Sequence, residues 1–177
     1  MKLAWLWFGV SVVLAALLYV QGRFAAHMAA HLLLSLGAAP ALIFALPGWR
    51  PRISAWLGFL SLTLVTYFLH IPTVYMRLMS PAGDLFMAVL FLVGGLPFWL
   101  AVWRGGASAF ILLVVQMLAC ALLGALVTFS RPAAYMTTPG DLTLGGVLMW
   151  VGGGAVFMGM ALWRLSRLLN HRKAVAA

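Results

Sequence analysis

The sequence predicts an all-α membrane protein, a polytopic bundle of six transmembrane helices, and three observations lead to this fold class. Of the 177 residues, 66% are hydrophobic and only 7% are charged, which is more apolar surface than a soluble domain of this size can bury. The apolar residues form runs close to the roughly 20 residues that a helix needs to cross a bilayer. Six such runs leave only short loops, so we predict one transmembrane helical domain over residues 1–177. The predicted spans are residues 3–20, 26–47, 53–70, 85–103, 107–129 and 142–163.

The first two spans differ in polar content. The first, within "LAWLWFGVSVVLAALLYVQGRF", could be a cleavable signal sequence, but it is long, contains two Trp residues and lacks an A-x-A-like site before Arg23. We therefore predict a retained helix. The second span opens with "FAAHMAAHLLL" and carries His27 and His31, four residues apart and hence on one helix face.

Two similar loops precede the fourth and sixth spans. The third span ends at His70, and the loop "HIPTVYMRLMSPAGD" then leads to Asp84, just as "SRPAAYMTTPGD" leads to Asp141. A carboxylate at a helix start accepts backbone N–H bonds, so a simple N-cap role suits both aspartates. The lone Cys120 lies in the fifth span, roughly 14 Å below its predicted outer end, and we interpret it as a small buried apolar residue apart from the histidines.

The basic residues orient the bundle. Six helices put both termini on one side, and placing them in the cytoplasm gives eight basic residues inside and three outside, as the positive-inside tendency expects. The inner residues are Lys2, Arg50, Arg52, Arg104, Arg164, Arg167, Arg172 and Lys173, and the outer ones are Arg23, Arg77 and Arg131. The net charge of +9 thus reflects topology and not nucleic-acid binding, and the segment "RLSRLLNHRK" suits contact with anionic lipid headgroups of the bilayer.

This topology gathers potential metal ligands at the outer face. Ionisable groups in membrane proteins usually face the bundle interior or an aqueous cavity, and imidazole with thioether is a ligand set that suits copper, Cu(I) in particular. We predict a copper site with His27, His31 and His70 as ligands and with Met28, Asp84 or Met87 completing or tuning it. Asp141 is expected to orient a ligand of this site or to cap its helix. Alternatively, the histidines form hydrogen bonds between helices.

Other functions fit the sequence less well than copper binding does. The chain has no Glu, no Gly-rich phosphate loop after a strand, no GxSxG and no HExxH, so we predict that it is not an enzyme. A copper transporter could use the same outer site as its entrance, but below His31 the chain offers mostly Ser35, Thr63 and Gln116. A membrane cytochrome could hold haem between His31 and His70, although both are predicted near the surface.

Four sequence blocks occur in an order typical of one membrane protein family. They are "HMAAHLLLSLGAAPAL", "HIPTVY", "FLVGGLPFW" and "DLTLGGVLMW", and together they resemble the CtaG-like family of membrane-integral cytochrome c oxidase assembly factors. The family's H-x-x-E-H block is here "DLFMA", with Asp84 at the first His, Met87 at the Glu and Ala88 at the second His, so the chain resembles a divergent, short member.

The resemblance implies a function, a location and partners. The function is a non-enzymatic copper chaperone that supports maturation of the oxidase copper centre. The location is the bacterial inner membrane. The partner is a cytochrome c oxidase subunit or another copper protein, and a homo-oligomer remains open.

Overall fold

The fold is that of a computed structural model, which describes residues 1–49 and 51–176, with the side chains of this part up to residue 170. This part of the chain is largely helical and contains no strand, which confirms the predicted all-α class. The elements in chain order are α1 (Lys2–Tyr19), α2 (Phe24–Leu32), the π-helical turn η1 (Leu33–Ala38), α3 (Ala39–Ala45), α4 (Ala55–Leu69), α5 (Pro72–Arg77), α6 (Pro81–Arg104), α7 (Ala107–Thr128), the 3-10 turn η2 (Pro132–Tyr135), α8 (Pro139–Val147), the π-helical turn η3 (Leu148–Gly153) and α9 (Gly154–Ala176).

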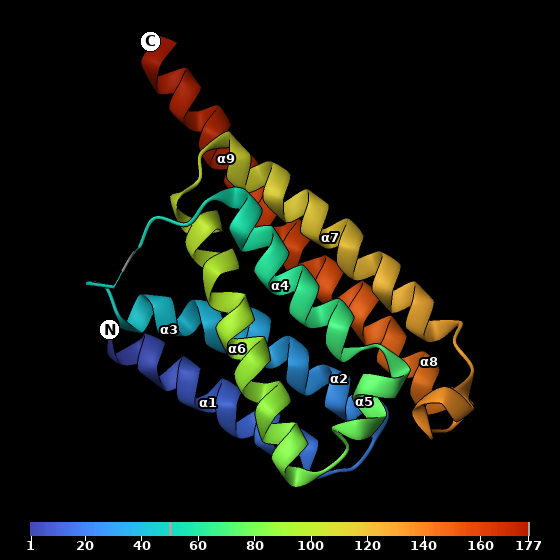
Figure 1. The fold of residues 1–177 in the computed structure, drawn as a ribbon. Coiled ribbons are helices and arrows are strands. Elements are labelled where there is room, and N and C mark those ends of the chain that lie inside the picture. The colour runs from blue at the N-terminus through green and yellow to red at the C-terminus, as the bar shows by residue number, and fades with distance from the viewer. Residues whose placement is uncertain (50, 177) are drawn as a thin grey trace.

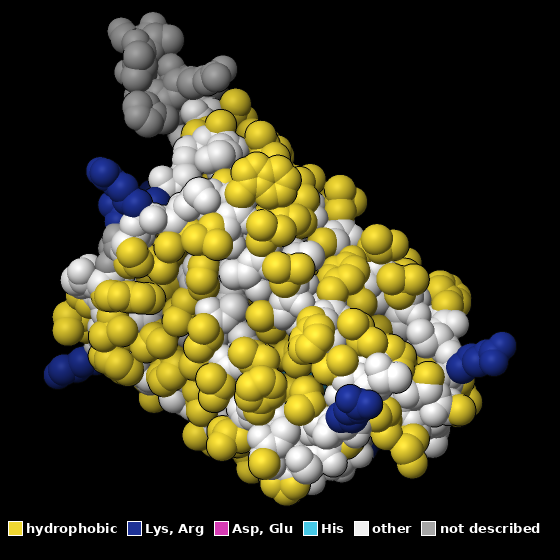
Figure 2. All heavy atoms as spheres, viewed as in Figure 1, with side chains coloured by type: hydrophobic (Ala, Val, Ile, Leu, Met, Phe, Trp, Pro, Cys, Tyr) yellow, Lys and Arg dark blue, Asp and Glu magenta, His cyan; other side chains and the backbone are white. Residues whose placement is uncertain are grey.

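Five continuous helices of the described chain are long and apolar enough to cross a membrane. They are α1, α2–η1–α3, α6, α7 and α8–η3–α9, while α4 is a shorter apolar helix of 15 residues. In the face drawn in Figure 2, hydrophobic side chains cover the middle and Lys and Arg side chains lie at the margins. On α7, for example, Leu118, Leu122 and Leu126 lie on one helix face and are 60%, 58% and 55% exposed, as expected of a surface that faces lipid. The chain is therefore a multi-pass membrane protein.

The helices run back and forth between two ends of the bundle (Figure 1). One end holds the connections 20–23, 70–80 and 129–138, and we call it the histidine end. The other holds the N-terminus, the connecting residues 46–49 and 51–54, and the connection 105–106, and we call it the terminal end. Of the basic residues, Arg23, Arg77 and Arg131 belong to the histidine end. Arg50 and the side chains of Arg172 and Lys173 lie outside the described part of the chain.

Interhelical hydrogen bonds join the helices inside the bundle. Thr63 Oγ1 of α4 donates to Gln116 Oε1 of α7 at 3.0 Å, and Trp99 Nε1 of α6 donates to the Ser35 carbonyl of η1 at 2.8 Å. In a π-helical turn a carbonyl pairs with the N–H five residues on, which for Ser35 would be Pro40, a residue without an N–H. The indole of Trp99 therefore satisfies a carbonyl that η1 leaves free, as an apolar environment requires.

Two glycines let α7 and α8 approach closely. A Cβ on Gly146 would collide with the Thr128 hydroxyl and lie 2.8 Å from the Gly124 carbonyl oxygen. Small residues at such positions allow transmembrane backbones to pack against each other.

The helices α6 and α8 begin earlier than the predicted spans, and their caps differ from the expectation. Ser80 Oγ and Thr138 Oγ1 each accept a backbone N–H bond from three residues on, at 3.1 and 3.3 Å. Each is followed by a proline, which is favoured at the first helical position. The expected N-cap role of Asp84 and Asp141 is therefore wrong, because both lie inside the first turn of an already capped helix.

Candidate metal site

Three buried histidines meet at the histidine end. His27 and His31 lie on α2 and His70 directly follows α4, and their exposed fractions are 5%, 3% and 2%. The ring centroids of His27 and His31 are 4.4 Å apart, and those of His31 and His70 are 5.5 Å apart. The helical spacing thus puts two imidazoles side by side, and the packing of the bundle brings the third to them.

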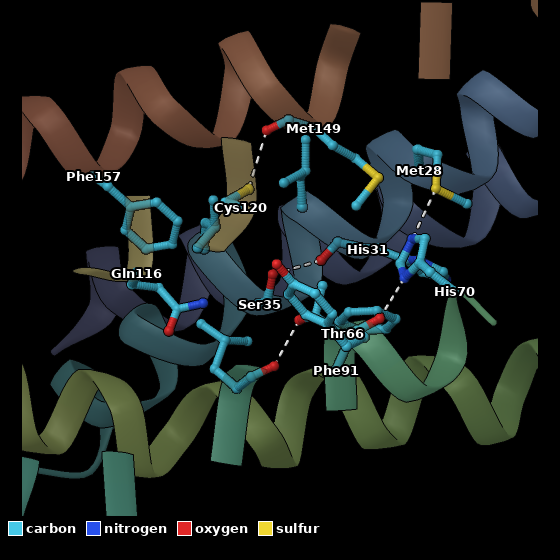
Figure 3. A pocket seen from close by; sticks show the side chains of 14 residues that line it. Met28, His31, Ser35, Thr66, His70, Phe91, Gln116, Cys120, Met149 and Phe157 are labelled. Carbon is cyan, nitrogen blue, oxygen red and sulfur yellow. Dashed lines mark hydrogen bonds between the residues drawn. The ribbon is translucent and has the colours of Figure 1, made fainter. Parts of the chain in front are cut away.

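The orientation of the His70 ring is fixed by two contacts (Figure 3). Its Nδ1 lies 2.6 Å from the Thr66 carbonyl oxygen and its Nε2 lies 3.0 Å from Met28 Sδ. A carbonyl oxygen can only accept, so Nδ1 carries the proton, and in a neutral imidazole Nε2 is then a bare nitrogen. A nitrogen lone pair therefore faces a thioether sulfur, and the second ring nitrogen has the backbone partner that is typical of metal-binding histidines.

Three of the four ring nitrogens of the other two imidazoles have no hydrogen-bond partner among the described residues. This is true of both ring nitrogens of His31 and of Nε2 of His27. Asp84 Oδ1 lies 3.7 Å from His27 Nδ1, which is too long for a hydrogen bond, and the Tyr19 hydroxyl beside His27 is also without a partner there. Each buried polar group left unsatisfied costs about 1–3 kcal/mol of stability. A ligand bound among these atoms would reduce that cost.

Aromatic side chains surround the histidines. The Phe91 ring stacks on His31 with centroids 3.9 Å apart and an interplanar angle of 24°, and Tyr75 packs edge-on against His27 at 5.3 Å. The Tyr135 hydroxyl donates to the His70 carbonyl at 2.7 Å. Burial raises the pKa of the Tyr75 and Tyr135 hydroxyls, so both stay protonated.

A cavity of about 30 Å³ extends from the histidines into the bundle. Met28, His31 and His70 line it at the histidine end, and Cys120 and Met149 line it further in (Figure 3). The Cys120 thiol donates to the Met149 carbonyl at 3.1 Å. Cys120 is buried as predicted, but the expectation that it lies apart from the histidines is wrong.

The remaining predicted residues have different surroundings. Met87 is fully buried and packs with Phe91 in an apolar cluster, whereas the Asp84 side chain is 26% exposed. As the side chains lie, no group of three or more His, Cys, Asp or Glu in the described chain could hold a metal ion. A site here would therefore need thioether sulfur besides imidazole, or a change of side-chain rotamers.

Asp141 contacts the start of α2 and not the histidine rings. Its carboxylate accepts the backbone N–H groups of Phe24 and Ala25 at 2.7 and 3.2 Å and the Thr137 hydroxyl at 3.2 Å. Arg23 lies 3.6 Å from it. Asp141 thus caps a neighbouring helix, the one that carries His27 and His31, so it positions the site from outside.

The sequence reasoning missed three residues that shape the site. Phe91 carried a usable signal, since it lies four residues after Met87 and seven after Asp84 and hence on the same helix face. The Thr66 carbonyl could also have been foreseen, because it lies four residues before His70. Nothing in the sequence singled out Tyr19.

The chain was compared with known proteins and families. Curated proteins and solved structures gave no match. The sequence model of the family described as cytochrome c oxidase caa3 assembly factor (Caa3_CtaG) matches residues 2–171. This match covers nearly the whole chain and confirms the predicted resemblance, so the protein belongs to the Caa3_CtaG family of cytochrome c oxidase assembly factors.

Proposed function

We propose that this assembly factor binds copper, as Cu(I), between its buried histidines and supplies it to the copper centre of cytochrome c oxidase. Membership of the family gives the role in oxidase assembly, and copper is the cargo that the side chains at the histidine end fit best. The role is that of a chaperone without catalysis of its own.

The observation that carries the proposal is the group of imidazole nitrogens without partners. His27 and His31 together present three such nitrogens, and the two side chains are only 5% and 3% exposed. An interhelical hydrogen-bonding role would leave these atoms paired, as buried polar groups generally are. A bound cation would instead take one bare ring nitrogen from each histidine, while the second ring nitrogen keeps its proton.

The ligand types favour copper over zinc. The bare nitrogen of His70 faces the Met28 sulfur at 3.0 Å, and mixed imidazole and thioether ligands select Cu(I), whereas zinc more often takes thiolate or carboxylate with histidine. Two imidazoles that share a tetrahedral metal about 2.0 Å from each nitrogen have ring centroids about 5 Å apart. The observed separations of 4.4 and 5.5 Å lie on either side of that value.

Met87 and Asp84 have supporting roles in this proposal. Asp84 is partly exposed beside His27, so its carboxylate would attract an arriving cation. Met87 packs behind Phe91 and would supply a further sulfur only after rearrangement.

The size and the lining of the cavity distinguish the two alternative functions, a haem protein and a copper transporter. A volume of about 30 Å³ suits an ion or a water molecule, whereas cofactor pockets measure about 300–1,000 Å³, so haem between His31 and His70 is disfavoured. A copper transporter remains the second candidate, because Cys120 and Met149 continue the line of sulfur-containing residues inward from Met28. Copper uptake into proteoliposomes would favour the transporter over the chaperone.

The proposed location is the bacterial inner membrane, with both termini in the cytoplasm and the histidine end outside. The excess of basic residues assigned to the terminal end supports this orientation. Reporter fusions in the loop around Arg77 test it, and a cytoplasmic result would place the histidines on the other side.

Copper stoichiometry and unfolding should be measured together on detergent-purified protein. We expect His27→Ala, His31→Ala and His70→Ala each to lower bound copper severely, because each removes one ligand of a shared site. The matched control is Ser61→Ala, which loses a hydrogen bond from α4 to the Gly94 carbonyl of α6 (3.0 Å) outside the cavity.

The purely structural alternative predicts a different pattern. Loss of an interhelical hydrogen bond would cost about 0.6–2 kcal/mol without any effect on copper. Full copper occupancy in all three histidine variants, with lowered melting temperatures as in the control, would exclude the copper site and leave only a structural role.

A further inference from the structure

A second pocket, lined by arginine and tryptophan, lies at the terminal end. It measures about 440 Å³ and lies between α3, α6 and α9. Trp103 of α6 and Trp163 of α9 form an aromatic wall, and three cations line the same pocket. These are Arg104, Arg164 and Arg167.

Arg164 is held in place by three contacts and still has an N–H donor without a partner among the described residues. Its Nη2 donates to the Val102 carbonyl, and its guanidinium carbon lies 5.7 and 5.5 Å from the ring centroids of Trp103 and Trp163. A guanidinium has five N–H donors, and the buried Nε of Arg164 has no hydrogen-bond partner among the described residues. Arg167 lies over the Trp163 ring at 4.8 Å.

The chain's own acidic side chains lie far from this pocket. It has only two, Asp84 and Asp141. Asp84 is 20 residues from Arg104 along α6, about 30 Å at helical rise, and Asp141 caps α2 at the histidine end. Neither aspartate can therefore compensate the positive charge of Arg164 and Arg167.

The apolar part of the pocket indicates what kind of anion fits. Beside the arginines it is lined by Ile43 and Leu100, which are buried, and by Phe44, which is 43% exposed. Arginine forks match phosphate geometry, tryptophan favours the membrane interface, and basic pockets between transmembrane helices bind anionic headgroups. A free phosphate would use the cations but not the apolar surface.

We propose that this pocket binds the phosphate of an anionic phospholipid, with Arg164 and Arg167 as its ligands and the acyl chains along the apolar wall. The site is separate from the histidines and does not depend on the proposed copper function. The bundle would hold one lipid at the terminal end, opposite the proposed copper site.

Lipid binding should be measured by native mass spectrometry of the full chain in a neutral detergent, titrated with phosphatidylglycerol, phosphatidylcholine or sodium phosphate. We expect phosphatidylglycerol to bind at least about tenfold more tightly than phosphatidylcholine, because both carry the phosphate but the choline cation of phosphatidylcholine is repelled by the arginines of the pocket. Arg164→Gln and Arg167→Gln should each reduce this preference. The controls, Arg77→Gln and Arg131→Gln, remove the same charge at the histidine end and should retain it.

Three results would overturn the proposal. One is equal affinity for the two lipids in the wild type, and another is an equal loss of preference in the control variants. The third is inorganic phosphate binding as tightly as phosphatidylglycerol, which would indicate a free-phosphate site. If Arg164→Gln does not fold, Arg167→Gln, an exposed position, and the wild-type lipid comparison still decide the question.

Discussion

Asp141→Ala should destabilise the protein because it removes the side-chain cap at the start of α2. Asp141 itself belongs to a different helix, α8. The carboxylate accepts the first two backbone N–H groups of α2, at 2.7 and 3.2 Å, and α2 has no side-chain cap of its own. The substitution therefore leaves two donors unsatisfied at the start of the helix that carries His27 and His31.

The magnitude follows from these contacts. A hydrogen bond to a charged group contributes about 1.5–3 kcal/mol, and the shorter of the two bonds should be near the upper part of this range. The ion pair with Arg23, whose side chain is 63% exposed, adds little, because exposed pairs contribute about 0–1 kcal/mol. Together we expect Asp141→Ala to lower the free energy of unfolding by about 2–4 kcal/mol.

The assay is unfolding of the detergent-solubilised protein by sodium dodecyl sulfate, followed by circular dichroism. Asp141→Asn keeps one acceptor oxygen, so its loss should be roughly half that of Asp141→Ala. Arg23→Gln tests the ion pair alone and should cost no more than about 1 kcal/mol. If Arg23→Gln costs as much as Asp141→Ala, or if Asp141→Ala unfolds like the wild type, the capping argument is refuted.

Three further substitutions test individual contacts. Met28→Leu keeps the side-chain volume but removes the sulfur that faces His70 at 3.0 Å; Cu(I) affinity, measured by competition with a chromogenic chelator, should fall at least about tenfold, with a stability loss below about 1.5 kcal/mol. Gly146→Ala should cost about 1–3 kcal/mol in the same unfolding assay because its Cβ meets α7, whereas Gly159→Ala, with open space around its Cβ, should be neutral or stabilising. Tyr135→Phe removes the bond to the His70 carbonyl and should lower stability by about 0.5–1.5 kcal/mol; no measurable change would show that this bond is dispensable.

Much of the fold could be predicted from the sequence because hydrophobic runs report membrane helices directly. The predicted spans differ from the structure mainly at the residues where the helices begin. Ser80 and Thr138 are each followed by proline, a pattern that occurs in loops as well as at helix starts, so the predicted spans begin several residues later than α6 and α8. The aspartates that follow are acidic residues of a first turn, which is also favourable next to the helix dipole.

The depth of the site was harder to predict. We expected the histidines near the surface because His70 ends a predicted span. However, α4 is short, and Tyr67 on its last turn donates to the Ala119 carbonyl of α7 at 2.9 Å. The Tyr67 side chain thus reaches the residue next to Cys120, and Tyr67, His70 and Cys120 line one cavity. Sequence patterns locate a helix end along the chain but not its depth in the bundle.

The role of the segment 129–141 follows from contacts that no local pattern could show. Asp141 caps α2 across 117 residues of chain, and Tyr135 of η2 donates to the His70 carbonyl across 65 residues. One short segment thus fixes the backbones of both elements that carry the histidines, although it contributes no ligand to the proposed site. A cargo site must hold its ligands in place before the ion arrives, since otherwise binding has to supply the free energy of ordering them. By anchoring α2 and the end of α4 from the same side, the segment holds the backbones that carry His31 and His70 in place before any ion binds.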